Sequence, residues 1–152
     1  MEIHEYLDKY RKGYIKKNGE YDKLEYYSFE KDFINHINDN KFSLIKKSRQ
    51  IHATTLLANY VSWLLIFNDK INIGYVSPNR ASNTHFLNLV NESIRNFNFN
   101  ITPRVNNTRE IRLNNDSTIF AMSDNINDLC GKSLNILIFD EATSALDSHA
   151  EQ

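Results

Sequence analysis

Apolar residues recur at helical spacing in three stretches of the chain. The first follows Ser28, a residue type favoured at helix N-caps, and ends near residues 38–40. The second begins near residues 52–54 and runs to Phe67, and the third includes residues 86–97. In each stretch the apolar side chains lie three or four residues apart. This spacing predicts three helices, each with an apolar face to bury.

Short apolar runs between these stretches predict strands. Three of them are typical of buried strands: 42–47, 71–76 and 134–141. Residues 109–113 and 117–122 flank an Asn-Asn-Asp turn, which predicts a hairpin, and Pro103 is expected to close a loop. Strands that alternate with helices predict an α/β fold with a mainly parallel sheet flanked by helices.

Length and composition set the domain count and exclude several classes. The 152 residues fit one domain over 28–152, with the charged, tyrosine-rich residues 1–27 as a helical extension. Cys130 is the single cysteine, so we expect no intrachain disulfide and a reducing compartment. The five histidines are scattered without metal-ligand spacing. No apolar run is long enough for a membrane span, and the charged N-terminus does not fit a secretory signal.

The strand predicted over 134–141 ends in two acids, Asp140 and Glu141. Ligands of open α/β sheets bind outside the carboxyl ends of the strands. In a Walker B arrangement the aspartate holds Mg²⁺, directly or through water, and the following glutamate orients or deprotonates the attacking water. The plain alternative is a strand that ends in two solvated acids. The strand, loop and helix predicted upstream favour nucleotide chemistry.

The upstream loop reads "SRQIHATT" over residues 48–55. A phosphate-binding loop needs a strand, a run of backbone N–H groups and the N-terminus of a helix. Thr54 is placed to offer its hydroxyl to Mg²⁺, and Arg49 could reach a phosphate. The usual lysine is replaced by Ala53 and the usual glycine by His52. The sequence therefore predicts a phosphate loop at the expected position between strand and helix, but one that lacks the lysine side chain.

These motifs resemble the ATPase domain of the large terminase subunit, the DNA-packaging motor of tailed bacteriophages. That family's Walker A motif reads Ser-Arg-Gln-x-Gly-Lys-Thr, and the chain matches it at Ser48, Arg49, Gln50 and Thr54. Further likeness lies in "INIGYVSPN", "REIRLNNDSTIFAMS" and "CGKSLNILIFDEA". The resemblance covers roughly residues 25–145. It implies a P-loop NTPase-like fold of the ASCE type.

The resemblance also implies a site, its cofactors and its partners. ATP and Mg²⁺ are the expected cofactors, with Thr54 and Asp140 at the metal and Glu141 and Arg49 as catalytic residues. The nucleotide would contact Glu30, Ser48, Gln50, Ile51, His52, Ala53, Thr54 and Thr55. The implied partners are viral double-stranded DNA, the portal protein and the small terminase subunit, in the cytoplasm of the phage's host, with no membrane partner.

The departures from the family lie where phosphates are handled. Loss of a charge that stabilises phosphoryl transfer costs about 10³ or more in rate, so weak or absent ATP hydrolysis is expected unless another chain supplies cations. Glu30 lacks the amide donor with which the family reads adenine. Cys130 stands where the family often has an arginine. The sequence also ends before the family's coupling strand and nuclease domain, so we expect an incomplete sheet that is completed by a missing C-terminal half or by homo-oligomer formation.

Other interpretations stay open. A degenerate, non-catalytic binding or regulatory module fits Ala53 and Cys130. "ILIFDEATSALD" is similar to an ABC-type ATPase, but a Leu-Ser-Gly-Gly-Gln motif and a Gly-rich loop are missing from the sequence. Gly131-Lys132-Ser133 spells the missing triplet, but a strand follows it instead of a helix, so we reject it as the phosphate loop. A DNA-binding module would rest only on Lys46, Lys47 and Arg49, a run typical of a solvated loop.

Overall fold

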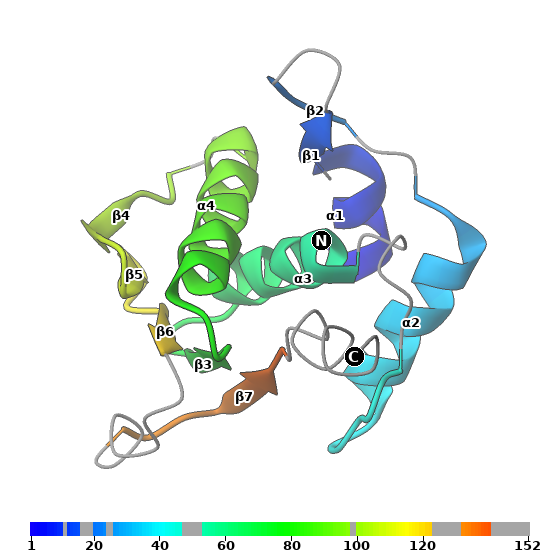
Figure 1. The fold of residues 1–152 in the computed structure, drawn as a ribbon. Coiled ribbons are helices and arrows are strands. Elements are labelled where there is room, and N and C mark those ends of the chain that lie inside the picture. The colour runs from blue at the N-terminus through cyan, green and yellow to red at the C-terminus, as the bar shows by residue number, and fades with distance from the viewer. Residues whose placement is uncertain are drawn as a thin grey trace.

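The computed structural model describes residues 1–10, 12–15, 20–23, 26–46, 53–97, 100–122 and 132–140, with backbone only for 12–15 and 20–23. Four helices and seven strands lie in these ranges (Figure 1). The helices are α1 (Ile3–Tyr10), α2 (Ser28–Asp39), α3 (Ala53–Phe67) and α4 (Arg80–Phe97). The strands are β1 (Lys12–Ile15), β2 (Glu20–Lys23), β3 (Asn72–Val76), β4 (Pro103–Asn106), β5 (Glu110–Leu113), β6 (Thr118–Met122) and β7 (Ile136–Phe139).

The main sheet has five strands in the order β4-β5-β6-β3-β7. β3 is parallel to both of its neighbours, β6 and β7, whereas β5 is antiparallel to both of its neighbours, β4 and β6. The predicted α/β class is therefore confirmed, but the sheet is mixed and not mainly parallel as predicted, because β4 and β5 add two antiparallel pairings to the two parallel ones. Because β3, β6 and β7 run in the same direction, their carboxyl ends meet at one edge. That edge is where an open α/β sheet binds ligands.

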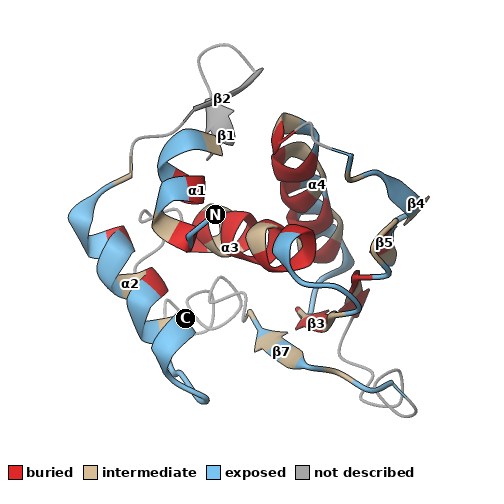
Figure 2. Ribbon diagram, turned by 180° about the vertical axis from the view of Figure 1, so that it is seen from behind, coloured by how far each residue is buried: buried red, intermediate tan, exposed pale blue. Residues whose placement is uncertain are grey.

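Helices α3 and α4 pack on each other and cover one face of the sheet (Figures 1 and 2). The sheet turns the alternate residues Ile73 and Tyr75 of β3 toward them, in register with isoleucines or alanine of the neighbouring strands. α3 contains no charged residue, and apolar side chains lie almost all around it. A helix of this composition belongs in the centre of a core, and α3 is almost entirely buried.

The turn between β5 and β6 holds the C-terminal end of α3. Asn115 Nδ2 donates a hydrogen bond of 2.8 Å to the carbonyl of Leu65, and Ser117 Oγ donates to the carbonyl of Asn68. Carbonyls at the end of a helix need such partners because they have none within the helix. The predicted hairpin therefore also ties α3 to the sheet, and this fixes where the N-terminus of α3 lies.

The N-terminal region differs from the peripheral helices predicted for it. Tyr6 and Leu7 of α1 are fully buried, and Tyr6 packs with Tyr10, Phe67 and Phe97 in an aromatic cluster. After α1 the chain forms the antiparallel β1–β2 hairpin instead of a second helix. Trp63 Nε1 donates to the carbonyl of Met1 at 3.0 Å, which ties the start of the chain to α3. This region is part of the core because its aromatic rings complete it.

Three strand predictions need correction. Residues 42–46 form no strand, and Phe42 and Leu44 are 86% and 98% exposed. β7 was expected to be buried, but Phe139 is 70% exposed. β4 begins at Pro103, where a loop was expected. The first two are linked. Because residues 42–46 form no strand, they do not pair with β7, and β7 pairs with β3 alone among the described strands. One edge of the sheet therefore stays uncovered there. A proline fits β4 because β4 is the opposite edge strand.

The remaining boundaries agree with the sequence to within a few residues. α2 begins at Ser28 itself, so Tyr27 is its N-cap. Residues 142–152, where the sequence also predicts the start of a helix, lie outside the described residues. Among those that the structure describes, no helix is both long and apolar enough to cross a bilayer.

Candidate functional site

Two residues predicted to share one site meet at the carboxyl edge of the sheet. Thr54 Oγ1 donates a hydrogen bond to Asp140 Oδ2 at 3.3 Å, although the two residues are 86 positions apart in the chain. Thr54 is the second residue of α3, and Asp140 directly follows β7. The Asp140 backbone N–H donates to the carbonyl of Val76 at 2.9 Å, so the parallel ladder continues one step beyond the strand. The backbone positions of both residues are therefore fixed, Thr54 by α3 and Asp140 by its hydrogen bond to β3.

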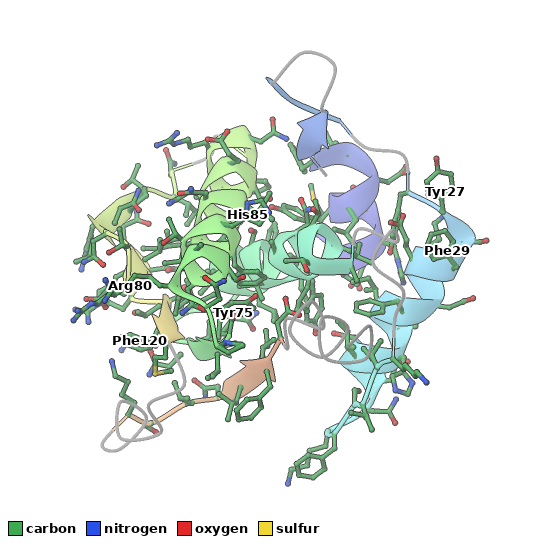
Figure 3. All side chains as sticks on the ribbon, viewed as in Figure 1. Tyr27, Phe29, Tyr75, Arg80, His85 and Phe120 are labelled. Atoms are coloured by element: carbon green, nitrogen blue, oxygen red, sulfur yellow. The ribbon has the colours of Figure 1, made fainter. Side chains whose placement is uncertain are left out.

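Tyr75, on β3, is the third member of this site. Its hydroxyl donates to Asp140 Oδ2 at 2.8 Å. The ring is 1% exposed and stacks on Phe86 of α4, with 3.8 Å between the centroids and 4° between the planes. Figure 3 shows Tyr75 where β3 and β7 meet below α4. Burial, followed by the charge and hydrogen bond of Asp140, raises the pKa of the Tyr75 hydroxyl. The phenol therefore stays protonated and remains a donor.

No sequence motif marks Tyr75, because it lies inside an apolar strand. A signal was nevertheless present. Residues of a strand alternate between its two faces, so Ile73 and Tyr75 point the same way, and Tyr75 is the one with a polar tip. It lies near the carboxyl end of β3, whose parallel neighbour ends in Asp140. A phenol at that place in a parallel sheet is within reach of the acid.

The N-terminus of α3 adds an electrostatic contribution. The first turn contains neither an acidic nor a basic side chain. The unsatisfied N–H groups of a helix N-terminus carry a partial positive charge that favours anions. Ala53, at the position of the family's lysine, is 7% exposed. A buried methyl group provides no charge, so among the described residues at this helix end the backbone N–H groups are what would favour an anion.

Glu30 has a structural role at the start of α2. Its Oε2 accepts a hydrogen bond of 2.9 Å from the Tyr27 backbone N–H, and the side chain is 2% exposed. This is one half of a capping box. Tyr27 and Phe29 stack on each other at the outer side of α2, at a distance from Tyr75 in Figure 3. The contact of Glu30 with adenine stays a prediction.

The other predicted site residues divide into described and undescribed ones. Thr55 is half-buried, and its carbonyl accepts a hydrogen bond from Asn59 Nδ2 at 2.6 Å. Outside the described residues lie Ser48, Arg49, Gln50, Ile51, His52, Cys130 and Glu141. Lys132 places its Nζ over the Phe120 ring, 3.7 Å from the centroid, and β7 follows within a few residues, in agreement with the rejection of this triplet as a phosphate loop.

The oxygen ligands at the site fit a hard cation that completes its coordination with water or substrate oxygens. Across the described ranges, no group of three or more histidine, cysteine, aspartate or glutamate side chains is placed to hold a metal. Thr54 and Asp140 offer a hydroxyl and a carboxylate. Mg²⁺ is usually bound by one or two carboxylates together with waters and substrate phosphates, so this pair suits Mg²⁺ that arrives with a nucleotide.

Comparison with known proteins adds no family: no protein-family model matches the chain, and a search of curated proteins finds no significant match.

Proposed function

We propose that this chain is a P-loop-type nucleotide-binding module, similar to the ATPase domain of large terminase subunits, that binds ATP together with Mg²⁺. One observation supports the proposal above all: Thr54 and Asp140 share a hydrogen bond across 86 residues. The two residues belong to separate sequence motifs, and the resemblance implies that one is the Walker A hydroxyl and the other the Walker B acid. Such motifs have to meet for Mg²⁺ to bind between them.

In this proposal the chain's own groups divide the work. The N-terminus of α3 faces the phosphates with its backbone N–H groups and its dipole. The Thr54 hydroxyl and the Asp140 carboxylate hold Mg²⁺, which when bound supplies positive charge to the phosphate oxygens. Arg49 and Glu141 keep the catalytic roles that the resemblance implies.

We propose further that the chain binds nucleotide better than it hydrolyses it. Ala53 places a buried methyl group where the terminase family has a lysine. The positive charge of that lysine normally stabilises the transition state of phosphoryl transfer. Turnover would then need cations from another chain, in a packaging assembly with double-stranded DNA, the portal protein and the small terminase subunit in an infected cell. A non-catalytic regulatory module is the second candidate, and Ala53 favours it.

Nucleotide titration of the purified chain tests the proposal. A fluorescent ATP analogue is titrated with Mg²⁺ and again with EDTA. We expect Mg²⁺ to strengthen binding of the analogue. Thr54→Val should lower the affinity measured in Mg²⁺ at least about tenfold, because one hydrogen-bonding group is lost. Thr102→Val, at an exposed position before β4, is the matched control and should bind like the wild-type chain.

A second comparison separates binding from hydrolysis. His52→Gly combined with Ala53→Lys restores the family's letters. This double variant should bind at least about tenfold more tightly and gain ATPase activity, because the lysine charge returns to the phosphates. A wild-type chain that binds no nucleotide, together with a double variant that gains no binding, would refute the phosphate site. Tighter binding without hydrolysis would favour the regulatory module.

A further inference from the structure

Two hydroxyl groups donate to the same oxygen of Asp140. Tyr75 Oη lies 2.8 Å from Oδ2, and Thr54 Oγ1 lies 3.3 Å from it. The shorter bond comes from the more firmly held residue, because Tyr75 is buried in the sheet and its ring stacks on Phe86. The χ2 torsion of an aspartate has a broad energy minimum, so a free carboxylate would sample many orientations. The Tyr75 hydroxyl, held by its buried and stacked ring, restrains the orientation of this carboxylate.

We propose that Tyr75 is a positioning residue, whose hydroxyl orients the Asp140 carboxylate for a divalent cation. This inference rests on the proposed function, because the cation is the one expected to arrive with the nucleotide. Tyr75 acts through Asp140 and needs no contact with the nucleotide.

The shared oxygen also sets how the carboxylate can act. A carboxylate oxygen has two lone-pair positions, and at Oδ2 both are used by hydroxyl donors. These two donors therefore restrain the orientation of the carboxylate, and because both are neutral hydroxyls the carboxylate keeps its negative charge for a cation.

A phenol suits this task better than a charged donor would. A lysine or arginine at this place would neutralise Asp140 and compete with the metal. A neutral hydroxyl orients the carboxylate and leaves its negative charge available. The buried ring, stacked on Phe86, holds this neutral hydroxyl against the carboxylate.

Tyr75→Phe tests the inference because it removes the hydroxyl and keeps the stacked ring. Binding of a fluorescent ATP analogue is measured with Mg²⁺ and with EDTA. We expect the affinity in Mg²⁺ to fall about tenfold, as for loss of a hydrogen bond to a charged group, and the affinity in EDTA to change less than about twofold. Tyr60→Phe is the matched control: it removes a hydroxyl that bonds Asn38 at 3.1 Å, and it should leave both affinities unchanged.

A double-mutant cycle separates positioning from a general effect on the fold. In an Asp140→Asn background, Tyr75→Phe should have no further effect on Mg²⁺-dependent binding. A structural role would lower affinity in both backgrounds and in EDTA alike, and that result would overturn the inference. Equal Mg²⁺-dependent binding by Tyr75→Phe and the wild-type chain would also overturn it, while leaving the proposed function intact. A wild-type chain whose binding ignores Mg²⁺ would overturn both.

Discussion

A buried tyrosine packs near each end of α3: Tyr6 of α1 near the C-terminal end and Tyr75 of β3 near the N-terminal end. The two hydroxyl groups differ in their surroundings. At the C-terminal end, Phe67 packs with Tyr6 in the aromatic cluster completed by Tyr10 and Phe97. At the N-terminal end, Thr54 and Tyr75 both donate to Asp140. The first end buries rings, and the second directs hydroxyl groups at one carboxylate.

The contrast between the hydroxyls shows how packing can be told from function. The Tyr6 hydroxyl is buried and has no hydrogen-bond partner among the described residues. A buried polar group without a partner costs free energy, so Tyr6 is there for its ring. The Tyr75 hydroxyl has a charged acceptor at a sheet edge where ligands bind. Substitutions at the two ends should therefore affect different properties.

The largest effect on stability is expected at the aromatic end. Phe97 is buried against Tyr6, Tyr10 and Phe67, and Phe97→Ala would leave a cavity among them. We expect the free energy of unfolding to fall by about 3–5 kcal/mol. Urea denaturation measures it, with Phe97→Leu as the milder control. A loss below about 1 kcal/mol would show that the cluster contributes little to the core.

Asp140→Asn should have the opposite profile. The asparagine keeps an oxygen that can accept from Tyr75 but loses the charge that attracts a cation. We expect Mg²⁺-dependent nucleotide affinity to fall by at least about thirtyfold, while the free energy of unfolding changes by less than about 2 kcal/mol. Titration and urea denaturation of the same sample measure the two. A large loss of stability with unchanged affinity would place Asp140 with the packing residues.

The two Tyr→Phe substitutions compare the hydroxyls directly. Tyr6→Phe removes a hydroxyl without a described partner and should raise the free energy of unfolding by about 1 kcal/mol. Tyr75→Phe breaks a bond to Asp140 and should lower it by a similar amount. Thermal unfolding of both variants in one buffer gives the comparison. Equal shifts of the same sign would remove the distinction between the two ends.

The free energy of unfolding should fall gradually as the pH becomes alkaline. Burial raises the pKa of Tyr6 and of Tyr75 in the folded state, and it does the same for Tyr60. Their stabilising contribution is complete below the ordinary tyrosine pKa of about 10 and is lost as pH rises above it, because the unfolded state ionises first. Each such tyrosine steepens the decline by up to about 1.4 kcal/mol per pH unit. Tyr6→Phe should make the decline shallower in denaturation curves at pH values above about 9.

Much of the fold could be predicted from periodicity. The helices α2, α3 and α4 and the strands β3, β5, β6 and β7 lie where the apolar spacing indicated them. Residues 42–46 have the composition of a strand, but a strand exists only where a neighbour pairs with it, and composition does not record the neighbour. Residues 1–27 were predicted as a helical extension of the domain, whereas the aromatic rings of α1 belong to its core.

The site could be predicted only in part. Thr54 and Asp140 belong to sequence motifs, and motif spacing sufficed to suggest that they meet. Tyr75 belongs to no motif. Its contact arises from the register of β3 and β7, which pairs Tyr75 with Ile138, two residues before Asp140 and on the same face of the strand. Register depends on the tertiary structure, so the sequence could suggest Tyr75 as a candidate but could not establish its contact with Asp140.

The hydrogen bond from Trp63 to Met1 has a practical consequence for measurements on this chain. Trp63 is the single tryptophan, and its indole stacks on Tyr60 and contacts the first residue of the chain. Tryptophan emission responds to the polarity and contacts of the indole, so its colour will report whether the N-terminal region is docked on α3. The fluorophore lies in the C-terminal half of α3, about two and a half turns from Thr54. Intrinsic fluorescence will therefore follow unfolding, and a nucleotide label will follow binding, as two independent optical signals in one cuvette.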